Sequence, residues 1–313
     1  MSATSPTVPG PCACRVVFGG NCSGVDLAGG FPSLRVALPV LAGADSEPLL
    51  AEAAAPAVRG GWSLFRRGML LAGFAVAEPE SDLEAAAGGL YRGLFEAAAG
   101  LHIYRIWNYV PQINALAGDM ENYRLFCSGR SLAFEDRFGA AFQGVLPASS
   151  AVGSAAGPLA VGFLAGGAPP RHFDNPRQVP AWNYPAQYGP RPPSFSRATS
   201  LATEDGRMIF VSGTAAIRGH SSVAGDLDGQ LGCTLDNLAL IGEASGAGSD
   251  LGGAAGWRRA FKVYLRHPAD LPFAQARLGR GFLRPDDTVS YLKADICRAD
   301  LVVEIEATLS LAS

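Results

Sequence analysis

Two glutamates, Glu304 and Glu306, are two residues apart in the apolar run VVEIEA near the end of this 313-residue chain. Side chains two positions apart point to the same face of a β-strand, so both carboxyl groups face one way and Ile305 faces the other. Burial among apolar neighbours raises the pKa of a carboxyl group, which can then keep its proton near neutral pH and act as a general acid. The spacing therefore predicts a strand that presents acid chemistry on one face.

The composition indicates a globular protein without a nucleic-acid partner. Apolar residues make up 48 % of the chain, charged residues 17 %, and the net charge is -3. Every apolar stretch, including residues 68–78, is interrupted too early to span a membrane, and the first thirty residues lack the pattern of a secretory signal. The six cysteines are scattered without CxxC spacing, which is typical of reduced thiols in a cytoplasmic protein. Cys12, Cys14 and Cys22 have no histidine nearby, so we expect no metal site there.

The elements that must position the acids follow one order twice. After a weakly ordered stretch over residues 1–30, the first half predicts a helix, a strand, a short polar helix and a strand at 81–100, 102–111, 119–129 and 158–165. The second half predicts a strand, a long helix, a strand, a short helix and a strand at 207–215, 226–246, 259–268, 269–279 and 302–311. Residues 158–165 and the acidic strand then occupy equivalent positions in a duplicated α+β unit, and only the second copy carries acids.

A proline-dense segment, residues 169–199, separates the two halves. Its prolines exclude a helix or a central strand. A linker between domains is one interpretation. Because the segment also contains many Arg, Tyr and Trp residues, an ordered binding element is the other.

Several of these segments carry a resemblance. FVSGTA, the long helix that follows it and the final VEIEA strand resemble the RidA/YjgF fold over about residues 195–313. The motifs YPAQYGPRPPSFSRA and SGTAAIRGH, together with RIWNYVPQIN and ENYRLFCSGR in the first half, are similar to the chorismatase family over about residues 100–313. The resemblance implies two pseudo-duplicated RidA/YjgF-like (chorismate mutase-like) units. Residues 1–168 would form a degenerate N-terminal domain, and residues 169–313 would form the catalytic domain, which begins with the Pro/Tyr/Arg-rich segment.

The resemblance also implies an activity. Chorismatases release the enolpyruvyl group of chorismate as pyruvate, and they need neither a metal nor an organic cofactor. The ring product differs between subfamilies: a dihydroxycyclohexadiene carboxylate by hydrolysis, 3-hydroxybenzoate by an internal route, or a mixture of hydroxybenzoates. Relatives of the RidA type are trimers, so we expect either a monomer or a homotrimer.

Site residues follow from the matched motifs. Glu304 is the expected proton donor, and Glu306 is expected to be a structural carboxylate at the sheet edge or paired with an arginine. A cysteine at the spacing of Cys297 from the acid distinguishes the 3-hydroxybenzoate-forming subfamily. Ala216 lies near the other position that separates subfamilies, and an alanine there points back to the hydrolytic group. The expected product is 3-hydroxybenzoate, with hydrolysis and a non-catalytic ligand-binding module as the alternatives.

Chorismate is a dianion, so its site needs cations. Arginine suits this role because its guanidinium binds a carboxylate through two parallel hydrogen bonds. We expect Arg191 and Arg277 to bind the carboxylates, with Tyr188 as a hydroxyl donor, although a surface or structural arginine is the ordinary alternative. Arg105 and Arg197 are weaker candidates, because a structural ion pair would explain each equally well.

Overall fold

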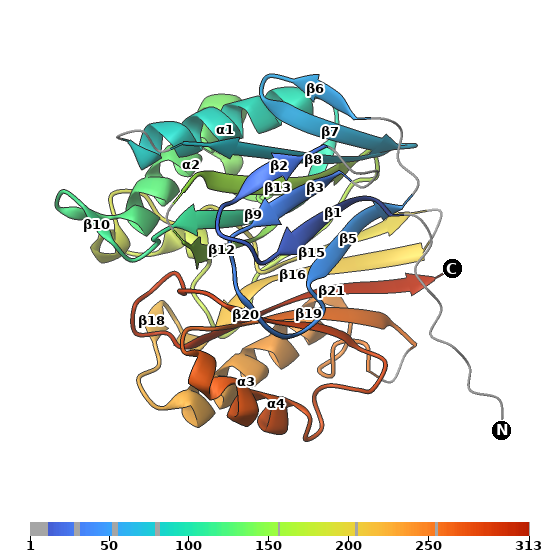
Figure 1. Ribbon diagram of the computed structural model, residues 1–313, viewed down its shortest axis with the longest axis vertical. Helices are drawn as coiled ribbons and strands as arrows, with labels where there is room; N and C mark the ends of the chain where they lie inside the picture. The colour runs from blue at the N-terminus through green and yellow to red at the C-terminus, as the bar shows by residue number, and fades with distance from the viewer. Residues whose placement is uncertain are drawn as a thin grey trace.

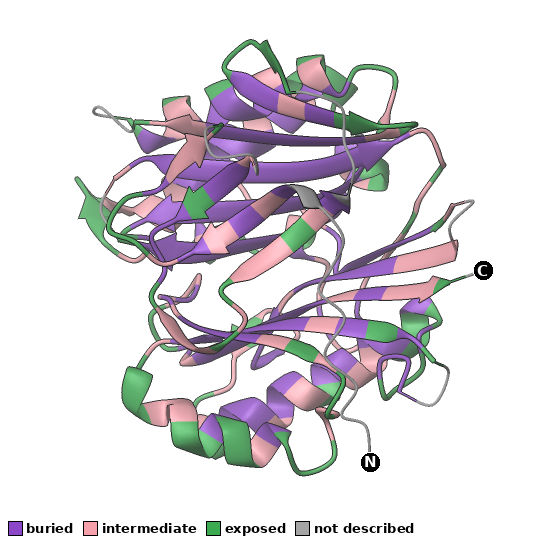
Figure 2. Ribbon diagram, turned by 45° about the vertical axis from the view of Figure 1, so that its right-hand side comes forward, coloured by how far each residue is buried: buried purple, intermediate pink, exposed green. Residues whose placement is uncertain are grey.

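Two β-sheets face each other, and each is covered on its outer side by two helices (Figure 1). The computed structural model describes residues 12–27, 32–51, 56–78, 82–155, 157–203, 206–253 and 256–312. Three clusters of buried apolar side chains fill it, one between the sheets and one beneath each pair of helices. In Figure 2 the strands are largely buried and the outer faces of the helices are exposed. The described residues contain no helix long and apolar enough to cross a membrane.

The first half of the chain forms a six-stranded sheet and two helices. The helices are α1 (Leu83–Ala97) and α2 (Asn122–Phe138), and the strands are β6 (Ala57–Arg59), β7 (Trp62–Arg67), β8 (Leu70–Ala77), β9 (His102–Pro111), β12 (Ala148–Ser154) and β13 (Leu159–Gly166). Their order across the sheet is β12-β9-β13-β8-β7-β6. β13 pairs antiparallel with both β8 and β9, whereas β12 runs parallel to β9.

The second half repeats this arrangement. Its helices are α3 (Leu227–Ser245) and α4 (Leu271–Leu278), and its strands are β14 (Arg171–Phe173), β15 (Ala198–Thr203), β16 (Gly206–Ala215), β19 (Arg258–Leu265), β20 (Thr288–Lys293) and β21 (Val303–Ala312). The order is β14-β15-β16-β21-β19-β20, and β21 pairs antiparallel with both β16 and β19 while β20 runs parallel to β19. The predicted α+β duplication is therefore confirmed, and β13 and β21 occupy equivalent positions.

A small sheet from the N-terminal region packs into the space between the two large sheets. It has the order β2-β3-β1-β5 and consists of β1 (Cys12–Phe18), β2 (Gly24–Asp26), β3 (Ser33–Val36) and β5 (Ser46–Ala51). Its side chains, such as Val16 and Leu34, share a core with Trp107 of β9 and Tyr264 of β19. The expectation of weak order over residues 1–30 is wrong for these strands, because alternating burial against the larger sheets stabilises them; residues 1–11 and 28–31 lie outside the described residues.

One further strand of the first half, β4 (Val40–Gly43), adds to the edge of the second half's sheet beside β20. Two short hairpins complete the fold: β10 (Leu116–Ala117) with β11 (Met120–Glu121), and β17 (Ile217–Arg218) with β18 (Ser221–Ser222).

The first two helices illustrate how local signals set element boundaries. The carboxylate of Asp82 caps α1 by accepting hydrogen bonds from the backbone N–H groups of Glu84, at 2.9 Å, and Ala85, at 3.1 Å. The second helix starts at Asn122 and ends before Gly139, whose φ of 78° is left-handed. It is longer than the predicted helix over residues 119–129, because the β10–β11 hairpin occupies the expected first turn and the buried face continues to Phe134.

The proline-dense segment is ordered. It starts with the edge strand β14 and continues through two short 3₁₀ turns, Ala181–Asn183 and Ala186–Tyr188. The backbone N–H of Ser196 donates to the carbonyl of Pro147 at 3.0 Å, which ties the end of the segment to the first half. The segment therefore crosses the junction of the two sheets as a structured element rather than as a free linker.

Candidate active site

A cavity of about 300 Å³ lies where the two halves meet. The first half contributes residues of α2 and β12, and the second half contributes the proline-dense segment, the end of β16, residues 297–300 and β21. This volume is at the lower end of the range for small-molecule sites. The acidic strand belongs to the second unit, as predicted. The expectation of a site in the C-terminal half is incomplete, because the first unit supplies the facing wall of the cavity.

Glu304 lines this cavity from the start of β21. It pairs with Ala215 of β16 on one side and with Tyr264 of β19 on the other, and it is 3 % exposed. Its Oε1 atom has no hydrogen-bond partner among the described residues. The predicted strand and the shared face of the two glutamates are confirmed, and an unpaired buried carboxyl oxygen is left at the cavity wall.

A bulge in β16 makes room for this carboxyl group. The pairing of β16 with β21 shifts between Val211 and Thr214, so Ser212 and Gly213 have no strand partner. A Cβ at Gly213 would lie 2.1 Å from Oε1 of Glu304. The glycine is needed here because the carboxyl group fills the space that any other side chain would occupy.

Glu306 carries the negative charge of the pair. It forms ion pairs with Lys262 of β19 and, at 2.8 Å, with Arg105 of β9, and all three side chains are buried. Burial alone would raise the pKa of Glu306, but Lys262 and then Arg105 outweigh that effect and lower its pKa to about 2. This confirms the expected arginine pair, although the site lies inside the protein and not at a sheet edge.

The pKa of Glu304 moves in the opposite direction. Burial raises it most, and the negative charge of Glu306 raises it further; Arg105 and Arg197 offset only part of the shift, and the result is about 8. Glu304 therefore keeps its proton at neutral pH. Of the two carboxyl groups on β21, Glu306 is charged and Glu304 is neutral, and a neutral carboxyl group is what a general acid requires.

Two buried arginines line the same cavity. Arg130 of α2 is 1 % exposed, and its Nε has no hydrogen-bond partner among the described residues. Its Nη2 lies 3.7 Å from the sulfur of Cys127, the hydroxyl of Tyr91 is a further hydrogen-bond partner of the side chain, and the guanidinium lies 4.8 Å from the ring centre of Phe126. Arg197 is 4 % exposed and donates to the hydroxyl of Tyr184 at 2.7 Å. Buried cations with so few anionic partners are suited to binding the carboxylates of a ligand.

A third arginine and two tyrosines form the outer part of the cavity. The guanidinium of Arg298 lies 4.0 Å from the ring centre of Tyr188 and 5.4 Å from that of Tyr184. The Tyr188 hydroxyl is 3.2 Å from Nδ1 of His220. The structure thus places Tyr188 in the cavity wall, beside a cation.

Cys297 also lines the cavity, seven residues before Glu304. Burial raises the pKa of its thiol, the nearby Glu304 adds to the effect, and the value reaches about 12. The sulfur is therefore a neutral thiol at physiological pH and not a thiolate nucleophile.

Three of the predicted site residues lie outside the cavity lining. Arg277, on α4, pairs with Asp228 at 3.1 Å on the exposed side of the helices, so we no longer assign it a role in binding substrate. Arg191 is bound to Glu135 of α2 at 2.5 Å, so its charge is already neutralised. Ala216 is buried and is not part of the cavity lining, whereas its neighbours Ala215 and Ile217 are.

The residue that sequence reasoning missed most clearly is Arg130. It follows Tyr123, Phe126 and Cys127 on the buried face of α2, at the spacing of successive helical turns. An arginine on an otherwise apolar helix face was the available signal, and it lies within the ENYRLFCSGR motif. The spacing of residues along α2 does not show where the buried face of this helix lies relative to β21.

Comparisons with known proteins identify the family. The family model "Chorismatase FkbO/Hyg5-like, N-terminal" matches residues 51–165. A chorismatase of Streptomyces rapamycinicus is 37 % identical over 238 residues, which cover 71 % of this chain and 69 % of the relative. This chain belongs to the chorismatase family.

Two further relatives support the assignment to the chorismatase family. A 3-hydroxybenzoate synthase of Streptomyces hygroscopicus is 40 % identical over 225 residues, which cover 66 % of this chain and 63 % of that protein. A crystal structure of a chorismatase matches with a TM-score of 0.85 at 29 % identity, covering 98 % of this chain and 96 % of the other. The sequence matches thus span about two thirds of the relatives' lengths, and the structural match spans nearly the whole chain.

Proposed function

We propose that this protein is a chorismatase that converts chorismate to 3-hydroxybenzoate and pyruvate. The observation that carries the proposal is Glu304, a buried carboxyl group that lines the cavity and whose pKa is raised to about 8. An enol ether is cleaved when its methylene carbon receives a proton, and a neutral carboxyl group is a suitable donor at neutral pH. The family's sequence relatives include a 3-hydroxybenzoate synthase.

The cations of the cavity suit a dicarboxylate. Arg130 and Arg197 are buried and line the cavity, and Arg298 lies at its outer part beside Tyr188. Binding of one carboxylate by each buried arginine would supply an ion-pair partner that neither guanidinium has among the described residues. We assign carboxylate binding to Arg130 and Arg197, and hydrogen bonding at the outer part to Tyr188.

The reaction begins with proton transfer from Glu304 to the enol-ether methylene. The resulting oxocarbenium ion weakens the bond between the ring carbon and the ether oxygen; the bonding electrons pass to that oxygen, which becomes the keto oxygen of pyruvate. In the internal route the oxygen of the neighbouring ring hydroxyl attacks the ring carbon that carries the ether as the ether bond breaks, and the hydroxyl proton returns to Glu304. The original bond between that oxygen and its own ring carbon then breaks, its electrons pass to the oxygen, and the oxygen takes up the proton that the ring loses on aromatisation. Chorismate then yields 3-hydroxybenzoate and pyruvate without consuming water.

Hydrolysis is the second candidate, and it differs by one water molecule. Water would take the place of the ring hydroxyl and leave a dihydroxycyclohexadiene carboxylate. The position of Cys297 in the cavity wall favours the internal route, since this thiol occupies space beside Glu304 and has no charge with which to activate water. Replacing it with alanine is expected to shift the product toward the diene.

The test supplies chorismate to the purified protein. Pyruvate is measured with a coupled dehydrogenase, and the ring product is identified by chromatography. In heavy-oxygen water, hydrolysis labels a product from solvent, whereas the internal route leaves the ring oxygen unlabelled. We expect pyruvate, 3-hydroxybenzoate and no solvent label in the ring.

The controls separate the alternatives. Glu304→Gln should abolish pyruvate release, whereas Glu243→Gln, at an exposed position of α3, should leave the rate unchanged. Binding of chorismate without pyruvate release would favour a ligand-binding module and overturn the enzymatic proposal. A diene product would overturn the internal route only.

A further inference from the structure

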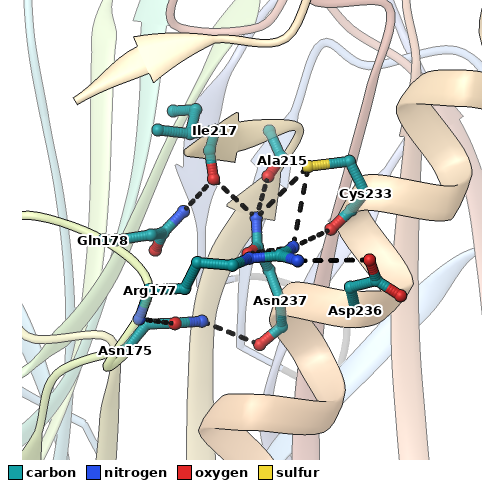
Figure 3. Close-up of polar contacts among 8 residues, drawn as sticks. All are labelled: Asn175, Arg177, Gln178, Ala215, Ile217, Cys233, Asp236 and Asn237. Carbon is teal, nitrogen blue, oxygen red and sulfur yellow. Dashed lines mark hydrogen bonds and ion pairs between the residues drawn. The ribbon is translucent and has the colours of Figure 1, made fainter. Parts of the chain in front are cut away.

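A cluster of polar contacts joins the proline-dense segment to α3 and to the backbone of Ala215 and Ile217 (Figure 3). Its centre is Asn237 of α3, which has no exposed surface. The side-chain Nδ2 of Asn237 donates to the carbonyl oxygen of Ala215 at 2.9 Å and to that of Ile217 at 3.0 Å. Both of these residues line the cavity, so one amide group binds the backbone of the wall at two points.

Arg177 fixes the orientation of this amide. Its Nε and Nη2 donate to Oδ1 of Asn237 at 3.1 and 2.8 Å. If the amide were flipped, its N–H groups would face the guanidinium and its oxygen would face two carbonyls, so a single orientation satisfies every partner. Arg177 therefore acts on the cavity wall through Asn237.

The remaining contacts of the cluster hold Arg177 in place. Its Nη2 donates to the carbonyl of Cys233 at 3.2 Å, and its Nη1 contacts Asp236, which is 60 % exposed, at 3.2 Å. Asn175 accepts from the backbone N–H of Arg177 and donates to the carbonyl of Asn237, both at 2.9 Å. The cluster joins the proline-dense segment to α3 through buried contacts and one exposed ion pair.

The wall needs this support because the sheet does not provide it. Pairing of β16 with β21 is interrupted by the bulge at Gly213 and ends at the pair Ala215–Glu304. Beyond that pair, Ile217 belongs to the two-residue strand β17, which pairs only with β18 among the described residues. The backbone that follows Ala215 is held by the short β17–β18 ladder, by a hydrogen bond from the Val223 N–H to the Ala216 carbonyl at 2.8 Å, and from the helix side by Asn237. Gln178 adds one more contact, because its Nε2 donates to the Ile217 carbonyl at 3.0 Å.

The cluster also connects two walls of the cavity. Arg177 and Gln178 belong to the segment that continues to Tyr184 and Arg197, and these last two line the cavity. The same hydrogen bonds thus set the distance between this segment and the wall beside Glu304.

We propose that Asn237, held by Arg177, is a positioning residue that determines product choice: it holds the Ala215–Ile217 wall so that the substrate ring meets Glu304 in the orientation that excludes water. This inference rests on the proposed function. According to this proposal, residues outside the cavity help to determine the ratio of 3-hydroxybenzoate to diene. They do so without contacting the charged groups of the substrate.

The test compares three variants at the surface of the cluster. Arg177→Met removes the donors to Asn237, Arg177→Lys restores one donor, and Asp236→Asn removes only the charge of the exposed partner. Loss of the two part-buried hydrogen bonds to Asn237 is expected to lower kcat/KM about tenfold in Arg177→Met and to raise the diene fraction. Arg177→Lys should recover part of the kcat/KM and part of the wild-type product ratio. The kcat/KM of Asp236→Asn should stay within about twofold of the wild-type value.

Asn237→Asp tests the centre of the cluster, because aspartate keeps the shape but cannot donate to the two carbonyls. The same change in product ratio is expected; if this variant does not fold, Arg177→Met decides. A folded Arg177→Met with the wild-type product ratio and kcat/KM would overturn the proposal, even if its melting temperature were lower.

Hydrogen exchange gives a readout that does not depend on turnover. Backbone amides of residues 213–217 should exchange faster in Arg177→Met than in Asp236→Asn. Unchanged exchange would overturn the positioning role. A wild-type protein that releases no pyruvate would overturn the proposed function. If the exchange difference is still present, the positioning of the Ala215–Ile217 backbone by Asn237 and Arg177 is supported all the same.

Discussion

The charge on Glu306 is expected to control the pH range in which Glu304 can donate a proton. The substitution Glu306→Gln removes this charge and leaves the side chain's shape nearly unchanged. Lys262 and Arg105 remain, and they no longer have their shared buried anion. Every electrostatic consequence of the substitution therefore stabilises the ionised form of Glu304 and lowers its pKa.

The size of the shift follows from the strand geometry. Side chains two residues apart on one face of a strand are separated by about 7 Å. At an effective dielectric constant of about 20, two unit charges at that distance interact with about 2 kcal/mol, or between one and two pKa units. From a wild-type value of about 8, the pKa of Glu304 in the variant is expected near 6.5.

The assay is the pH dependence of kcat/KM for pyruvate release from chorismate. The protonated carboxyl group is the active form, so activity is present below the pKa of Glu304 and is lost as the pH rises through it. The basic limb should lie near pH 8 in the wild type and move to lower pH in Glu306→Gln. Circular dichroism and thermal unfolding check that the variant is folded.

Glu47→Gln is the matched control. Glu47 also pairs with Lys262, but it lies on β5 and not beside Glu304 on β21, so its removal should move the limb much less. A folded, active Glu306→Gln whose basic limb stays near pH 8, or moves to higher pH, would refute the electrostatic coupling between the two glutamates.

Three further predictions concern the cavity. Because the folded-state pKa of Glu304 is raised from 4.5 to about 8, stability is greatest below the unfolded-state pKa and falls as the pH rises through the folded-state pKa. Glu304→Gln should remove roughly 2–5 kcal/mol of this loss between pH 5 and pH 9, measured by urea unfolding, and an unchanged pH dependence would count against the raised pKa. Arg130→Met should lower kcat/KM at least about 30-fold and raise the melting temperature, because this buried cation has no ion-pair partner among the described residues; a lower melting temperature would show that the arginine is structural. Gly213→Ala should reduce kcat by about 100-fold by displacing the Glu304 carboxyl group, whereas a near wild-type rate would show that the carboxyl group can move aside without loss.

Local patterns in the sequence determined a large part of the fold and the shared face of the two glutamates. Alternation in VVEIEA is sufficient to place both glutamates on one face of a strand, and the repeated order of helices and strands is sufficient to predict the duplication. These are properties of neighbouring residues, and both helical and strand periodicity act over a few positions. The two glutamates could therefore be placed together before any contact was known.

Only the tertiary structure decided which arginines share the cavity and which glutamate keeps its proton. Arg277 and Arg130 both lie on helices, yet one pairs with Asp228 at the surface and the other is buried and lines the cavity. The difference between Glu304 and Glu306 depends on Lys262 and Arg105, which reach β21 from other strands. Electrostatic effects depend on distance in space and on burial, and local periodicity specifies neither of them across two facing sheets.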